Sequence, residues 1–142
     1  MRRYLVVANQ TLGGDALLDR LRELTAEDRC AIHVLVPASA DPTEAFHDEV
    51  SDRRLARERL EAALSRFGEL DATVTGEVGD HRPVDAVRDV LRREQAFDRI
   101  LVSTLPAGVS RWLRLDTISR IERVVDVPIE HLVGPKAPAD ER

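Results

Sequence analysis

Short apolar runs alternate along this chain with segments of helical periodicity, and this alternation restricts the possible folds more than any other feature. The run at residues 4–8 is apolar throughout, which is typical of a strand buried on both faces of a parallel sheet. We predict strands at 4–8, 31–36, 72–78, 100–103 and 129–133, and helices at 15–24, 51–67, 83–91 and 117–124. Regular strand–helix alternation indicates parallel strands with helices on both faces, so the expected fold class is α/β.

Local sequence signals set the expected ends of these elements. Ser51 and Asp116 are the expected N-caps of the second and fourth helices, and Gly68 is the expected stop of the second. Pro83 suits the first turn of the third helix. The alternating pattern at 72–78 is typical of a half-exposed strand near a sheet edge. At 142 residues the chain suits one domain, expected at 1–134, followed by a charged, flexible tail at 135–142.

Charge and composition exclude several classes of function. A net charge of −5 argues against a nucleic-acid binder, which needs a basic stripe. The arginines at 53–59 have the acidic neighbours Asp52, Glu58 and Glu61, so they are expected on a solvated helix face. The single cysteine, Cys30, excludes an internal disulfide and is expected as a small buried side chain. No run approaches the ~20 apolar residues of a membrane span, and the first run is too short for a signal peptide, so a cytoplasmic protein is expected.

The expected ligand crevice lies at the carboxyl ends of the two most apolar strands, 4–8 and 100–103. Ligands of open parallel sheets bind outside these ends, where the strand order reverses. The candidate ligand-binding residues are Ala8, Asn9, Thr11, Val36, Ser103, Thr104, Gly108, Ser110, Arg111 and Thr117. Hydroxyls and arginine suit a phosphate or carboxylate, and glycines admit a ligand to backbone amides.

Purely structural roles compete with this interpretation. Asn9 or Thr11 would serve as the cap of the next helix, Trp112 would pack its loop onto the sheet, and Arg111 would face solvent. The segment at 38–50 is long for a loop in a compact domain, so we expect it either to be mobile or to cover another part of the molecule. No GxGxxG, Walker or GxSxG motif occurs. The four histidines are dispersed in sequence, so no metal site is expected.

The chain resembles the universal stress protein family over most of residues 3–133. The resemblance rests on the polar turn after the first strand, on Gly79-Asp80 with Pro83, and on three later stretches. These are the Asp-led strand at 97–103, the helix entry at 112–121 and Val127-Pro128-Ile129. The resemblance implies a five-stranded parallel sheet in the order 3-2-1-4-5, as in adenine nucleotide alpha hydrolase-like folds. It also implies an ATP site with an aspartate after strand one and a Gly-x2-Gly-x9-Gly-Ser/Thr motif after strand four.

This chain departs from the family motif at four positions. Asn9 replaces the aspartate, and the three glycines fall on Ser103, Pro106 and Asp116. Only Thr117 matches in register. Pro106 removes an amide, and Asp116 would place a carboxylate near the phosphate, which disfavours ordinary ATP binding.

Three hypotheses follow. The first is a non-catalytic regulatory or binding module that holds an adenine nucleotide such as ATP or AMP, or another small anion, in a modified crevice. The second is a ligand-independent homodimer that has lost ATP binding and pairs through the strand at 129–133. The third is a hydrolase or transferase acting through Ser110 or Arg111, for which the sequence places no base.

Overall fold

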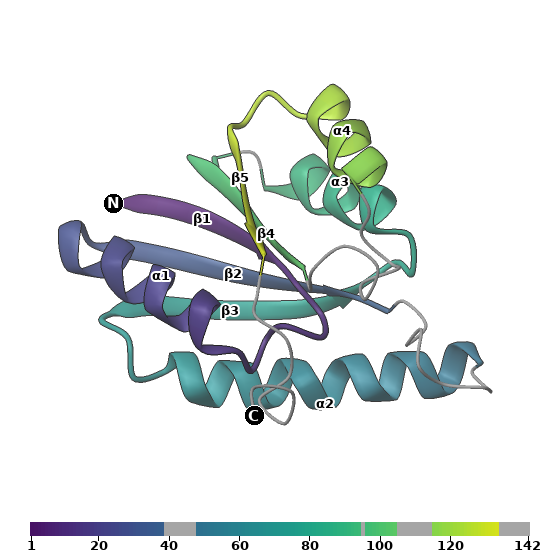
Figure 1. Ribbon diagram of the computed structural model, residues 1–142, viewed down its shortest axis with the longest axis horizontal. Helices are drawn as coiled ribbons and strands as arrows, with labels where there is room; N and C mark the ends of the chain where they lie inside the picture. Colours follow the sequence, from purple (N-terminus) through teal and green to yellow (C-terminus); the bar gives the residue numbers. More distant parts are fainter. Residues whose placement is uncertain (39–47, 95, 105–114, 134–142) are drawn as a thin grey trace.

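The computed structural model describes residues 1–38, 48–94, 96–104 and 115–133, with the backbone alone described at 115–117. Strands and helices alternate along it, as the sequence predicts (Figure 1). The elements are β1 (Arg2–Val7), α1 (Asp15–Glu27), β2 (Cys30–Pro37), α2 (Glu49–Phe67), β3 (Ala72–Gly79), α3 (Pro83–Arg93), β4 (Arg99–Thr104), α4 (Leu115–Val124) and β5 (Ile129–Val133).

The five strands form one parallel sheet in the order β3-β2-β1-β4-β5. This confirms the α/β class and the strand order that the family resemblance implied. β1 lies at the centre, and Val6 pairs with Val34 of β2 on one side and Leu101 of β4 on the other. All three side chains are fully buried, which explains why these strands read as unbroken apolar runs. The carboxyl ends of β1 and β4 are therefore neighbours.

Two helical layers cover the two faces of the sheet. α1 and α2 lie on one face and α3 and α4 on the other (Figure 1). Phe67 of α2 belongs to the same hydrophobic core as Val6 and Val34, whereas Ile121 of α4 belongs to the other core, with Leu5 and Val7. Successive strand residues thus supply opposite cores, as the pleat requires.

The second helix begins two residues earlier than predicted, and its cap is Asp48 instead of Ser51. The Asp48 carboxylate accepts a hydrogen bond of 2.8 Å from the Ser51 backbone N–H, so Ser51 is the third residue of the helix. This hydrogen bond lowers the pKa of Asp48. The prediction of Ser51 as the N-cap is therefore wrong, although serine and aspartate are both good capping residues. Gly68 does end the helix, in a right-handed conformation.

The remaining differences concern the ends of elements. α4 begins at Leu115, so the predicted N-cap Asp116 lies inside the helix. α1 runs three residues beyond its predicted end, to Glu27.

β3 and β5 form the two edges of the sheet, and the edge position of β3 agrees with the alternation of its sequence. Cys30 is buried, as predicted. None of the described helices combines the length and apolar character that crossing a membrane requires. The loop residues 39–47 and the expected tail lie outside the described residues.

Candidate functional site

The turn after β1 is organised by Asn9, which is 3% exposed. Its Nδ2 donates to the Pro37 carbonyl at the end of β2 at 2.8 Å, and its Oδ1 accepts from the guanidinium of Arg59 on α2. Asn9 therefore connects three elements. The cap of α1 is Gly14, which makes no side-chain capping bond, so neither Asn9 nor Thr11 caps that helix.

A pair of buried hydroxyls joins this turn to the end of β4. Thr11 Oγ1 and Ser103 Oγ lie 2.6 Å apart, and the two residues are 7% and 2% exposed. The structure thus brings together two candidate residues 92 positions apart in sequence. Each hydroxyl satisfies the other, which removes the cost of burying it alone. The pair bridges the centre of the expected crevice.

Thr104 makes a second contact at the same edge of the sheet. Its Oγ1 lies 2.8 Å from Nε2 of His131 on β5. Burial lowers the pKa of His131, so the imidazole is neutral near pH 7 and the contact is between two uncharged groups. The expected strand order made β4 and β5 neighbours, but it did not predict the contact between these two side chains.

The other candidate residues fall into three groups. Ala8 and Val36 are buried, and the Ala8 N–H donates to the Leu35 carbonyl at 3.2 Å, so both belong to the core beneath the turns. Gly108, Ser110 and Arg111 lie outside the described residues. Thr117 lies in α4, where only its backbone is described.

A cleft of about 220 Å³ opens beside the turn, toward α2 and away from Ser103. We call it the α2 cleft. Its lining residues come from the turn and from one face of the helix. They are Asn9, Gln10, Leu12, Gly13, Arg59, Ala62, Ala63 and Arg66.

Two guanidinium groups from α2 enter the lining of this cleft. Arg59 reaches Asn9, as described above. Arg66 donates to the Gly13 carbonyl and, at 2.8 Å, to the Asp15 carboxylate. The expectation that the arginines at 53–59 all face solvent is therefore wrong for Arg59, which is partly buried. Its partner Asn9 belongs to a turn 50 positions away, and the local charge pattern could not reveal that contact.

The sequence did carry one signal for this cleft. Arg59, Ala62, Ala63 and Arg66 follow the spacing i, i+3, i+4 and i+7, which places them on a single helix face. Two arginines that flank two small residues leave room between helix and turn. Charged residues on such a face normally point to solvent, so the pattern becomes informative only when the opposing turn is known.

A scan against protein-family models gives no match for this chain, and neither does a search of curated proteins. The fold is nevertheless similar to solved structures of universal stress proteins. One is UspA from Lactobacillus plantarum, at 12% identity and a TM-score of 0.65, over 92% of this chain and 97% of that one. Another is from Archaeoglobus fulgidus, at 16% identity and a TM-score of 0.56, over 92% and 97%.

A universal stress protein family protein from Arabidopsis thaliana, with AMP bound, is similar at 15% identity and a TM-score of 0.61, over 99% of this chain and 100% of that one. The chain therefore has the fold of the universal stress proteins along almost its whole length. The sequence identities are low, as expected for a divergent sequence. At such identities, the structural similarity establishes the fold alone.

Proposed function

We propose that the chain is a divergent universal stress protein-like binding module, non-catalytic, whose ligand is an adenine nucleotide or another small anion held at the α2 cleft. The observation that carries the proposal is the pair of guanidinium groups, Arg59 and Arg66, in the lining of a cleft beside the β1 turn. The turn after a central strand is where open parallel sheets bind ligands. The similar Arabidopsis structure, with AMP bound, supports a nucleotide.

The lining of the cleft combines the two properties that a nucleotide needs. Guanidinium groups form paired hydrogen bonds with phosphate or carboxylate oxygens. Leu12, Ala62 and Ala63 add an apolar wall on which a flat ring can lie. A volume of about 220 Å³ is below the ~300–1,000 Å³ typical of small-molecule pockets. It suits a compact anion or one part of a nucleotide, with the rest extending outward.

The geometry favours the α2 cleft over a phosphate site at Ser103. The Thr11–Ser103 hydroxyl pair already bridges the β1 turn and β4. Pro106 and Asp116 occupy positions at which the family resemblance implies glycines of a phosphate-binding motif. A ligand that relies on arginine side chains in place of bare backbone amides is consistent with both features.

The test is isothermal titration of the full chain with AMP, ATP and inorganic phosphate, comparing Arg66→Ala with Arg57→Ala. Arg57 is an exposed arginine of the same helix and does not line the cleft. We expect Arg66→Ala to weaken binding by about tenfold or more, the loss of one charge-assisted contact, and Arg57→Ala to leave it unchanged. Absence of heat with all three ligands, or equal losses in both variants, would refute the site. Hydrolysis of ATP by the wild-type chain would refute the non-catalytic role.

Homodimer formation through β5 is a second candidate function. β5 is an edge strand, and in the described part of the chain its pairing partner is β4 alone. Val133 at its end is 54% exposed, and an accessible strand edge is a template for a second copy.

Light scattering across a concentration series tests the dimer. We expect Val133→Lys to shift a dimer to monomer, because charges on an edge strand block pairing. Val124→Lys is the matched control, an exposed valine on α4 instead of the strand. A wild-type chain that remains monomeric, or a dimer that survives Val133→Lys, would exclude this interface.

A further inference from the structure

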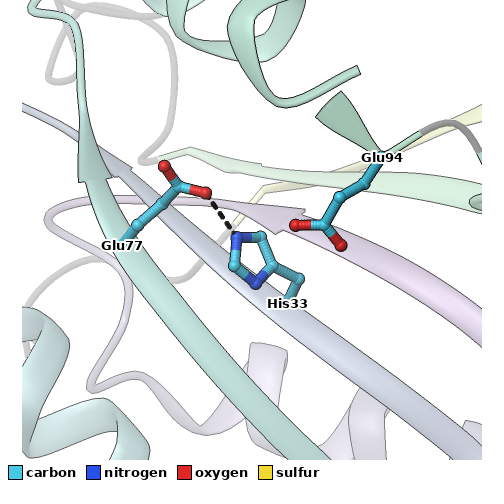
Figure 2. Close-up of side chains that lie close together, drawn as sticks. All are labelled: His33, Glu77 and Glu94. Atoms are coloured by element: carbon cyan, nitrogen blue, oxygen red, sulfur yellow. Dashed lines mark hydrogen bonds and ion pairs between the residues drawn. The ribbon is translucent and has the colours of Figure 1, made fainter. Parts of the chain in front are cut away.

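His33, Glu77 and Glu94 converge on the sheet face that carries α3, at mid-strand and away from the α2 cleft. They come from β2, β3 and the residue that ends α3. One ligand atom from each lies within 4.8 Å of those of the other two. Figure 2 shows both carboxylates pointing toward the imidazole ring. The side chains are 12%, 29% and 34% exposed, so the cluster is largely enclosed and open on one side.

We propose that this cluster binds a divalent first-row transition cation such as Zn²⁺. One imidazole nitrogen and two carboxylate oxygens form a mixed set that suits zinc and its neighbours, whereas Mg²⁺ prefers oxygen donors alone. Three protein donors with a partly exposed fourth side leave one position for water.

The hydrogen bonds of His33 orient the ring for this role. Its Nδ1 lies 2.7 Å from Thr75 Oγ1, and its Nε2 lies 2.7 Å from Glu77 Oε2. Without a cation, Nε2–H donates to the Glu77 carboxylate, whereas a bound cation would replace that proton and leave Nδ1–H to donate to the Thr75 hydroxyl. Histidine ligands of metals usually have such an outer partner on the second nitrogen. Thr75 is therefore a positioning residue for the cation.

Closing the site requires only a small movement. Tetrahedral coordination at the usual zinc distances places donor atoms about 3.4 Å apart. Glu77 Oε2 and His33 Nε2, at 2.7 Å, would have to separate by about 0.7 Å to admit the cation. The Glu94 side chain, at the end of a helix and one-third exposed, would have to approach by at most about 1.4 Å, because its ligand atom lies within 4.8 Å of the other two.

Two arginines compete with the cation for the same carboxylates. Arg93 donates to Glu77 Oε2 at 2.6 Å, and Arg3 donates to Glu94 Oε1 at 3.1 Å. Without a metal ion, the two arginines balance the negative charges of the two carboxylates. A cation would therefore have to displace these arginines or share the carboxylates with them. Removing the 54% exposed Arg93 should therefore tighten binding, the opposite of what loss of a ligand would do.

The test is titration of the chelator-treated full chain with Zn²⁺, with Mg²⁺ in parallel and thermal unfolding as the check on folding. We expect one Zn²⁺ per chain and no comparable Mg²⁺ binding. Glu94→Gln, at an accessible helix end, and His33→Gln should each weaken Zn²⁺ at least tenfold. Thr75→Val should weaken it about tenfold, as outer partners of metal ligands do. Arg93→Gln should strengthen it severalfold.

His81→Ala is the matched control, because His81 lies 3.3 Å from the Asp80 carboxylate in an exposed histidine–acid pair outside the cluster. It should leave Zn²⁺ binding unchanged. The proposal is overturned if the wild-type chain binds no Zn²⁺, if folded Glu94→Gln binds it as well as the wild type, or if His81→Ala loses as much affinity as His33→Gln.

Discussion

At Gly76, β3 packs closely against side chains of α2. A Cβ built there would lie 2.6 Å from Leu60 Cδ1 and 3.0 Å from the Val34 carbonyl oxygen. Glycine normally weakens a strand, so its presence in one marks a close approach of neighbouring groups. Here it allows the α2 side chains to pack directly on the sheet.

Gly76→Val should lower the free energy of unfolding by about 1–3 kcal/mol, the usual cost of forcing extra methyl groups into a packed core. Urea denaturation gives this value directly. Gly13→Ala is the control, since a Cβ at that position has no neighbour within 4 Å, and it should change stability little. A valine variant as stable as the wild type would show that α2 can move away from β3 without cost.

β5 is anchored to the rest of the molecule by a charged cluster at Glu130. Arg20 of α1 donates to both carboxylate oxygens, at 2.6 and 3.0 Å, and Arg99 of β4 donates to one of them at 2.9 Å. The hydrogen bonds from Arg20, followed by its charge and the contacts of Arg99, lower the pKa of Glu130 despite its partial burial. The side chains of Arg20 and Glu130 are 28% and 25% exposed, so solvent screens this pair less than it screens fully exposed pairs.

Glu130→Gln should destabilise the chain by about 1–2 kcal/mol at neutral pH, because charged hydrogen bonds are replaced by neutral ones. The folded pKa lies below the ordinary 4.5, so the stabilisation is fully present above 4.5 and is lost as pH falls through the folded pKa. Urea midpoints of the wild type and the variant, measured from neutral to acidic pH, should converge in that range. A constant difference across the whole range would contradict the charge-based explanation.

At the scale of the whole molecule, two cores share one sheet. The α1/α2 core and the α3/α4 core receive alternate residues of the same strands, as Val6 and Val7 of β1 show. Loss of either helical layer would expose one face of every central strand to water. The two layers should therefore unfold together, as is usual for single domains of this size.

Phe67→Ala on α2 and Ile121→Ala on α4 test this coupling. Both side chains are fully buried, and their truncation should cost about 3–5 and 2–5 kcal/mol respectively. Each variant should shift one common transition, observed by circular dichroism and by hydrogen exchange of strand amides. Two separate transitions in either variant would show that the layers unfold independently.

The α/β fold could be predicted from sequence because its signal is local and repeated. Strands such as 4–8 and 100–103 carry apolar residues on both sides only when both faces of the sheet are covered. Coverage of both faces indicates a parallel sheet. The ends of helices were less predictable. Ser51 was predicted as the N-cap of α2, but Asp48, three residues earlier and also of a good capping type, is the cap in the structure.

The proximity of the β1 turn to the end of β4 was predictable, whereas the individual contacts there were not. The strand order places the β1 turn beside the end of β4, and Thr11 does meet Ser103 there. The contact of Arg59 with Asn9 and the cluster at His33 join residues that are far apart in sequence, and local periodicity does not reveal such pairs.

The sequence by itself determined the class of fold, the central strands and the edge of the sheet at which to look for a ligand, because burial and pleat impose a periodicity on neighbouring residues. Only the tertiary structure decided which polar groups satisfy one another and which side chains surround a cleft or a cation. Those outcomes depend on distances between elements, and such distances are fixed by packing of the whole sheet and its two helical layers.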